Sequence, residues 1–162
     1  MRPPRPTLND PAVCAAAAAD MMTRIIACDG FEMDEEDGAE DLANALEDAD
    51  NAFRVAMGLY DRGWTISNDV MEILLDHDVA LFDALPVAVK AWVKEHGVTC
   101  RFAVGAKVRG MVDGAEHVGE VTQVEAEEAR YVVLVPALGH VRTGNGTHGV
   151  YLNDEDLDVE AA

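Results

Sequence analysis

The sequence predicts an α+β protein, in which an N-terminal bundle of four to five helices precedes a small antiparallel β-barrel of five strands. Apolar residues recur at spacings of three and four up to Gly97, as in amphipathic helices. After Gly97 the pattern changes to short β-branched runs separated by turn residues. The 162 residues are enough for two small domains. We therefore expect a flexible arm at 1–9, a helical domain at 10–97 and a barrel domain at 98–162.

The first predicted helix follows the proline-rich arm. Asp10 is expected to be its N-cap and Pro11 its first residue, because these residue types favour those two positions. The helix is expected to end near residue 28, just before Asp29 and Gly30. Its buried face is expected to include Val13, Met21, Ile25 and Ile26.

The second predicted helix spans residues 39–60 and follows an acidic loop at 30–38. Residues 29–50 contain 11 acidic side chains and no Lys or Arg. Acidic residues in the first turns of a helix interact favourably with its positive end. The spacing of four and three predicts one buried stripe of Leu42, Leu46, Ala49, Phe53, Ala56 and Tyr60.

Two shorter helices complete the predicted bundle. Ser67 is expected to cap a helix that ends near His77. Proline is tolerated in the first turn of a helix, so Pro86 is expected to begin a helix over 86–96 that Gly97 terminates. His77 and His96 would then lie at helix C-termini, where a cation is favourable. The side chains expected in the core are Trp64, Val70, Ile73, Leu74, Val89, Trp92 and Val93.

Five short strands are predicted in the C-terminal part of the chain. They cover residues 102–109, 118–124, 131–135, 150–152 and 157–159. Pro136 is expected to end the third strand, because proline cannot donate to a sheet. Residues 139–149 are rich in glycine, and Asn145-Gly146 is a favoured hairpin turn. Short strands separated by turn signals are typical of a small barrel.

The motifs of this region occur in a recognisable order. They are Gly105-Ala-Lys-Val-Arg109, Gly119-Glu-Val-Thr-Gln-Val124, Tyr131-Val-Val-Leu-Val135, Gly149-Val-Tyr-Leu152 and Asp156-Leu157. Over about residues 102–160 this order resembles SH3-like barrels of the KOW and Tudor-like kind. The resemblance implies a five-stranded SH3-like barrel with a binding groove between its loops. No family is recognised for the N-terminal helices.

The net charge of −19 limits the possible partners. Residues 1–97 carry 20 acidic and 7 basic side chains, and residues 98–162 carry 11 and 5. Binding to nucleic acid or to an anionic membrane needs Lys and Arg to displace counterions, so we expect neither as a direct partner. The same charge attracts basic protein surfaces. A basic, nucleic-acid-binding protein is therefore the expected partner.

The cysteines and the hydropathy pattern predict a cytoplasmic location. Cys14, Cys28 and Cys100 are an odd, widely spaced set that fits reduced thiols better than disulfides or a metal site. The apolar run 13–19 is too short for a signal peptide, and Asp20 and Arg24 follow it directly. No segment is long enough to span a membrane.

No motif in the sequence predicts catalysis, a metal or a cofactor. The spacing of the acidic residues does not match a calcium-binding loop. The glycine-rich segment 139–146 lacks the Gly-Lys-Ser/Thr ending that binds phosphate. Ser67 is the only serine and is better explained as a cap. His117, His140 and His148 lie in separate predicted loops, without the paired spacing of a zinc site.

The preferred function is therefore that of a non-catalytic acidic interaction protein. Carboxylates held on helices can lie where the phosphates of a duplex would lie in a basic channel. We expect a nucleic-acid-mimicking inhibitor of a nucleic-acid-binding protein, of the kind that phages use against host defence, anti-CRISPR proteins included. The residues expected to contact the partner are Asp34, Glu35, Glu36, Asp37, Glu40, Asp41, Glu47 and Asp48.

Two alternatives stay open at the level of sequence. The barrel could be an SH3-like module that binds a protein or peptide, with the helices as its scaffold. The candidate residues are then Tyr131, His140, Arg142 and Tyr151. The other alternative is an enzyme with an unrecognised site, which a metal held by His117, His140 and His148 would support.

Overall fold

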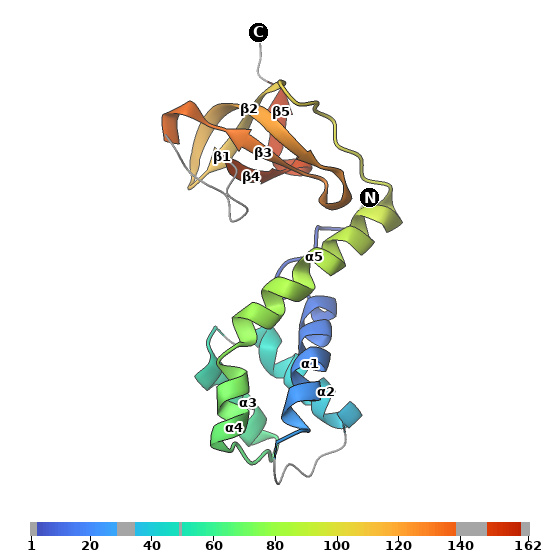
Figure 1. Cartoon of the computed structure of the whole chain (residues 1–162), viewed down its shortest axis with the longest axis vertical. Coiled ribbons are helices and arrows are strands. Elements are labelled where there is room, and N and C mark those ends of the chain that lie inside the picture. Colours follow the sequence, from blue (N-terminus) through green and yellow to red (C-terminus); the bar gives the residue numbers. More distant parts are fainter. Residues whose placement is uncertain (1–2, 29–34, 49, 139–148, 160–162) are drawn as a thin grey trace. The chain divides into compact units, whose positions relative to one another are not determined.

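The computed structural model describes residues 3–28, 35–48, 50–138 and 149–159. The chain forms two compact units, a helical unit (Met1–Trp92) and a sheet unit (Val93–Ala162), and each is described by itself. Five helices precede a five-stranded antiparallel sheet, as Figure 1 shows. The predicted α+β class is confirmed.

Helix α1 (Pro11–Ile25) begins as predicted. The Asp10 carboxylate accepts a hydrogen bond of 3.0 Å from the Ala12 amide, and Pro11 occupies the first turn. A broad face of this helix is buried, comprising Val13, Cys14, Ala17, Ala18, Met21, Met22 and Ile25. The prediction that Ile26 belongs to this face is wrong, because Ile26 caps the helix and is 40% exposed.

The predicted helix over 39–60 is two helices, α2 (Glu35–Asp48) and α3 (Ala52–Asp61). Asn51 has an extended backbone, and its side chain accepts a hydrogen bond of 3.0 Å from the Arg54 amide. Asparagine is among the preferred N-cap residues, so it starts a new helix at this point. Helix α2 also begins earlier than predicted, and it includes residues 35–38 of the expected loop.

The new start of α3 changes which side chains are buried. The face toward the core now carries Ala52, Val55, Ala56 and Leu59. Phe53 and Tyr60 are each 66% exposed, so their predicted place in the core is wrong. Leu42, Leu46 and Ala56 are buried as predicted, and Ala49 lies outside the described residues.

Helix α4 (Asn68–Leu74) begins at the predicted cap, where the Ser67 hydroxyl accepts a hydrogen bond of 3.2 Å from the Val70 amide. Its inward side chains Val70, Ile73 and Leu74 are buried, as predicted. The placement of His77 at a helix C-terminus is wrong. The His77 ring is buried at the start of α5, where its Nδ1 lies 3.1 Å from the Leu74 carbonyl oxygen.

Helix α5 (His77–His96) is longer than predicted and contains Pro86 in its interior. Proline removes one backbone hydrogen bond but does not always end a helix. Side chains are buried on both sides of Pro86, with Ala80 and Leu81 before it and Val89, Trp92 and Val93 after it. This burial offsets the cost of the missing bond. Gly97, with a φ of +59°, ends the helix as predicted.

The sheet unit contains five strands in the order β4-β3-β2-β1-β5, and neighbouring strands are antiparallel. The strands are β1 (Lys107–Val112), β2 (Ala115–Glu125), β3 (Arg130–Leu134), β4 (Val150–Asn153) and β5 (Leu157–Val159). Short 3₁₀ turns follow three of them, including Asp154–Asp156 between β4 and β5. The number of strands agrees with the prediction, and four of them lie close to their predicted positions. The predicted start of the first strand at residue 102 is wrong, because Gly105, with a φ of +89°, lies in a turn and β1 begins at Lys107.

The sheet curls around its own core, in which Val108, Val121, Tyr131, Val133, Val135 and Leu157 are buried. A Cβ atom on Gly110 of β1 would lie 2.8 Å from Leu157 and 3.1 Å from Leu152 of β4, so side chains of both edge strands pack over β1. A register shift between Val121 and Gln123 adds to the bend. The result is a curled half-barrel whose edges are β4 and β5.

Candidate protein-binding surface

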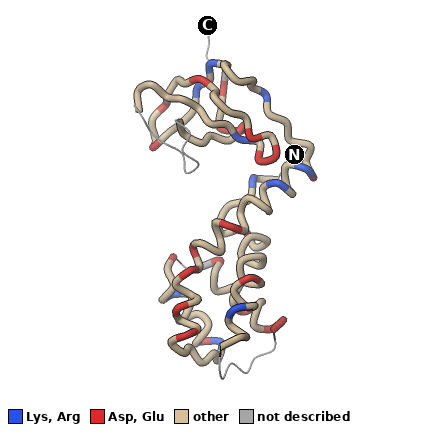
Figure 2. The backbone as a smooth tube through the Cα atoms, in the orientation of Figure 1, with Lys and Arg blue, Asp and Glu red and all other residues tan. Residues whose placement is uncertain are grey.

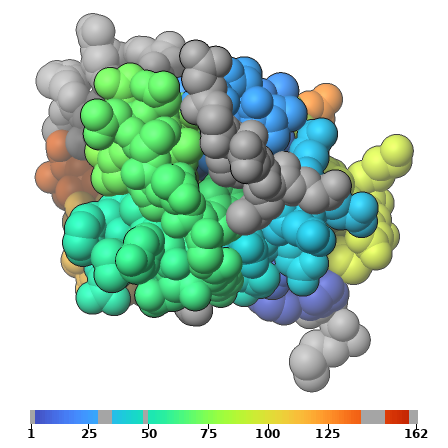
Figure 3. Space-filling view, turned by 90° about the horizontal axis from the view of Figure 1, so that it is seen from below, coloured from blue at the N-terminus to red at the C-terminus, as the bar shows by residue number. Residues whose placement is uncertain are grey.

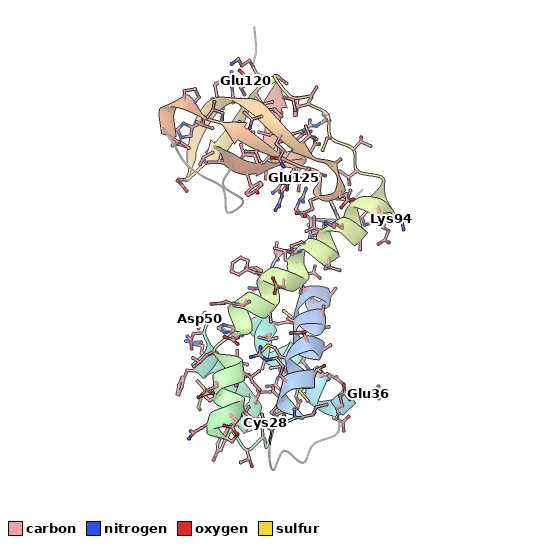
Figure 4. The ribbon with its side chains drawn as sticks, viewed as in Figure 1. Cys28, Glu36, Asp50, Lys94, Glu120 and Glu125 are labelled. Atoms are coloured by element: carbon pink, nitrogen blue, oxygen red, sulfur yellow. The ribbon has the colours of Figure 1, made fainter. Side chains whose placement is uncertain are left out.

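Helix α2 presents an acidic face to solvent. Glu35, Glu36, Asp37 and Glu40 are all exposed, and the first three lie in the first turn. Figure 4 shows Glu36 projecting away from the helical unit. Gly38, Leu42, Ala45 and Leu46 form the opposite, buried face, which fixes the direction of the carboxylates. Asp34 and the side chain of Asp48 lie outside the described residues.

Asp41 is held within the helical unit, because both of its oxygens have partners there. One oxygen accepts a hydrogen bond of 3.0 Å from Trp64 Nε1, and the other lies 3.5 Å from Arg62 Nε. Asp41 therefore connects α2 to the turn after α3 and is less available to a partner than sequence alone predicts. Glu47 is half-buried, and its charge adds to the burial that raises the pKa of Cys14 to about 11.

The three arginines between residues 10 and 85 each pair with a carboxylate. Residues 10–85 contain 19 acidic side chains and three arginines. Arg24 lies 2.8 Å from Asp76, and Arg54 lies 3.2 Å from Asp50. Arg62 pairs with Asp41 as described above. Acidic residues occur on every helix of the unit, as Figure 2 shows, so its surface has a large excess of negative charge.

Tyr131, a candidate of the alternative site, is fully buried. Its hydroxyl donates a hydrogen bond of 2.6 Å to Asp154 and accepts one of 3.1 Å from the Phe102 amide. Burial and the bond to Asp154 raise the pKa of Tyr131 well above its usual value. The prediction that Tyr131 faces a partner is therefore wrong, and its role is structural.

Asp154 is the centre of this buried network. It accepts hydrogen bonds from the Arg101 amide at 3.0 Å and from Arg101 Nε at 2.9 Å, besides the bond from Tyr131. Arg101 also donates to the Asp154 and Leu157 carbonyl oxygens. Burial alone would raise the pKa of Asp154, but the bonds from Tyr131 and Arg101 together lower it. The network ties the segment before β1 to the turn between β4 and β5.

Tyr151 is also a candidate residue of the alternative site, and its side chain is exposed to solvent. It lies on β4, is 36% exposed, and packs under the guanidinium of Arg130, whose central carbon is 4.3 Å from the ring centroid. Arg130 in turn pairs with Glu125 at 2.5 Å and with Glu128 at 3.1 Å. The other two candidates, His140 and Arg142, lie outside the described residues.

The described residues contain no group of three His, Cys, Asp or Glu side chains that could hold a metal ion. Of the three histidines considered for zinc, His117 is half-buried on β2, and His140 and His148 lie outside the described ranges. Within the part of the chain that the structure describes, no helix combines the length and apolar character needed to cross a membrane.

Exposed apolar side chains form a feature that the sequence analysis missed. On α3, Phe53, Met57 and Tyr60 lie on one face and are 66%, 45% and 66% exposed. A second set lies at the end of α4 and along α5, comprising Leu75, Val79, Phe82 and Val87. Figure 3 shows the outer surface of α3 and α4 as one continuous face in teal to green. Recognition of Asn51 as an N-cap would have revealed the first set.

Comparison with known proteins finds no family model that matches the chain, and no curated protein and no solved structure matches it significantly. The fold class and the surfaces described above therefore rest on the chain itself.

Proposed function

We propose that the chain is a non-catalytic interaction protein whose acidic helical unit binds a basic surface of another protein. The observation that carries this proposal is the charge of α2, where Glu35, Glu36, Asp37 and Glu40 are all exposed on one folded helix. A helix holds these carboxylates in fixed positions, so little side-chain and backbone entropy is lost when a partner binds. Arg24, Arg54 and Arg62 each pair with one carboxylate, so most of the 19 acidic side chains of residues 10–85 are not neutralised by an arginine.

The partner is proposed to be a nucleic-acid-binding protein that the chain inhibits. Such a protein carries Lys and Arg in an array that normally meets phosphates. An acidic helical surface satisfies the same array and speeds the encounter electrostatically. Inhibition of a host-defence nuclease, as by phage anti-defence proteins, is one form of this function.

The test uses a variant in which the α2 carboxylates lose their charge. It combines Glu35→Gln, Glu36→Gln, Asp37→Asn and Glu40→Gln and is named the α2-neutral variant. The full chain is immobilised, and proteins from a lysate of its native host cell are captured at low and at high salt. We expect a nucleic-acid-binding protein that the wild type retains at low salt, with its affinity lowered about tenfold or more in the α2-neutral variant.

A control variant carries the same change of charge on the sheet unit. It combines Asp113→Asn, Glu116→Gln, Glu127→Gln and Asp158→Asn, all at exposed positions. This variant is expected to bind like the wild type, because its helical surface is unchanged. Equal weakening in both variants would show that only the net charge matters and would contradict a specific α2 surface.

The second candidate function assigns the binding to the sheet unit. The strand order β4-β3-β2-β1-β5 and the 3₁₀ turn between β4 and β5 support the inference of an SH3-like architecture. Tyr151, half-exposed beneath Arg130, is then the described residue most suited to contact a peptide. Tyr151→Ala in the full chain should abolish capture of the partner if this function is correct, and should leave capture unchanged if α2 is the binding surface.

A further inference from the structure

The first half of α5 is apolar on both of its sides. Ala80 and Leu81 are buried in the core of the helical unit. Val79, Phe82 and Val87 are 60%, 60% and 68% exposed, and Leu75 at the C-cap of α4 is 62% exposed. We refer to these four exposed residues as the α5 stripe. Exposed apolar side chains on a helix that already buries its other side form a candidate site of interaction.

The charges around the α5 stripe are mostly negative, and Lys90, one turn beyond Val87, is the lysine of α5 nearest to it in the sequence. Asp78 is 71% exposed and Asp83 is exposed beside it. Between Arg62 and Lys90 the sequence has five acidic residues and no Lys or Arg. Two of these acids have nearby cationic or ionisable groups: Arg24 pairs with Asp76 at 2.8 Å, and His77 Nε2 lies 3.2 Å from Asp78.

This charge decides what kind of partner can cover the stripe. A second copy of the chain would bring the same acids, and its overall charge of −19 would oppose association. A segment that carries Lys or Arg beside apolar residues would instead complement both properties. An amphipathic helix presents its side chains in that way, with anchors at spacings of three and four.

We propose that the α5 stripe is a docking surface for a basic amphipathic helix of a partner protein. The apolar face of that helix lies on Val79, Phe82 and Val87, and its Lys or Arg side chains lie opposite Asp78 and Asp83. This surface is distinct from the acidic face of α2, and the proposal does not require that the partner binds nucleic acid.

The test measures binding of a labelled synthetic peptide to the full chain by fluorescence anisotropy. The peptide has about 18 residues, with leucines on one helical face and lysines on the other. Measurements are made near physiological salt, where interactions between distant exposed charges are screened. We expect Val79→Ser combined with Phe82→Ser to weaken binding about tenfold or more.

The chain offers a matched control for the loss of exposed apolar surface. Phe53→Ser combined with Tyr60→Ser removes two side chains from α3 that are each 66% exposed, next to the paired residue Arg54. This variant is expected to bind within about twofold of the wild type. Equal weakening by both double variants would mean unspecific adsorption to apolar residues and would overturn the proposal.

The charge part of the proposal has its own variant and its own probe. Asp78→Lys combined with Asp83→Lys leaves the α5 stripe intact and is expected to weaken binding about tenfold or more. A peptide of the same composition, scrambled so that no apolar face forms, should bind the wild type about tenfold more weakly. Equal binding of both peptides would mean attraction by charge alone and would overturn the proposal.

Two further measurements locate the peptide site and test for self-association. Amide NMR spectra of the wild type should show peptide-induced shifts centred on α5. Shifts centred elsewhere would contradict the proposal even if a variant failed to fold. Sedimentation that showed a dimer dependent on Phe82 would assign the α5 stripe to a second copy of the chain and would overturn the proposal.

The α2-neutral variant should bind this peptide like the wild type. The present proposal and the proposed function therefore fail in different experiments.

Discussion

At the scale of single residues, the most constrained polar group of the sheet unit is the Asp154 carboxylate. A buried carboxylate is strongly unfavourable unless it is fully hydrogen-bonded. Here Arg101 and Tyr131 supply the donors, and the Tyr131 hydroxyl also accepts the Phe102 amide. The network thus joins three segments that are far apart in the sequence, and loss of one member leaves others unsatisfied.

Tyr131→Phe should therefore destabilise the sheet unit by about 1–3 kcal/mol, because the Phe102 amide and the Asp154 carboxylate each lose a partner. Urea unfolding of the full chain, monitored with a spectroscopic probe in the sheet unit, measures this loss of stability. Tyr151→Phe is the control, since Tyr151 is half-exposed and no hydrogen bond of its hydroxyl contributes to this network. Equal effects of the two substitutions would contradict a structural role for the Tyr131 hydroxyl.

The same network gives a pH dependence with a defined sign. The pKa of Asp154 is lowered in the folded state from its ordinary value of 3.8. Its ionised form thus stabilises the fold above that pH, and this contribution is lost as the pH falls below it. Asp154→Asn should be less stable than the wild type at pH 7, with a smaller difference near pH 3. Urea midpoints at the two pH values test this, and a difference that grew on acidification would contradict it.

Gly119 on β2 is expected to tolerate no larger side chain. A Cβ atom there would lie 2.5 Å from Val133 Cγ1 and 2.7 Å from the Leu134 carbonyl oxygen. Gly119→Ala should cost about 1–3 kcal/mol, because the backbone cannot move aside freely. Gly58→Ala in α3 is the control, since its Cβ would meet ordinary contacts at 3.5 Å and alanine favours a helix. Thermal melts of the two variants should shift in opposite directions.

At the scale of elements, Asn51 separates α2 from α3 and so determines which face of α3 is exposed. Its side chain satisfies the Arg54 amide at 3.0 Å, as Ser67 satisfies the Val70 amide at 3.2 Å. Asn51→Ala should lower the stability of the helical unit by about 1 kcal/mol. The midpoint of its thermal unfolding by circular dichroism measures this loss. Asn51→Asp, which retains a cap, should leave the midpoint nearly unchanged.

Local signals in the sequence predict the elements well where one residue determines the outcome. Asp10 with Pro11, Ser67 and Gly97 mark helix ends correctly, because each acts through its own backbone or its nearest amides. The prediction fails where tertiary contacts decide. Pro86 continues α5 because side chains on both sides of it are buried, and no local rule contains that information.

For the candidate sites too, local features could be predicted from the sequence and long-range contacts could not. The acidic character of α2 follows from composition, and the exposure of Glu35, Glu36, Asp37 and Glu40 agrees with a solvent-facing helix. The difference between buried Tyr131 and half-exposed Tyr151 depends on strand pairing, in which Tyr131 opposes Val124 and Leu152. The role of Asp41 depends on Trp64, 23 residues away in the sequence. Such long-range partners are not visible in the spacing of residues.

At the scale of the whole molecule, charge and exposed apolar surface occur together in the helical unit. A net charge of −19 opposes association between copies of the chain and favours encounter with basic surfaces. Electrostatic attraction mainly increases the rate of encounter, whereas buried apolar anchors mainly lower the rate of dissociation. We therefore expect the association rate with a basic partner to fall steeply with salt and the dissociation rate to change little, which stopped-flow or surface-based kinetics can measure.

The most direct test of the central proposal is a competition between the chain and nucleic acid for the captured partner. Labelled duplex DNA is bound to that partner, and increasing amounts of the full chain are added while anisotropy reports the bound DNA. The wild type should displace the DNA, and the α2-neutral variant should need about tenfold or more protein to do so. A partner that holds the DNA and the chain at the same time would contradict the proposal that α2 takes the place of phosphates.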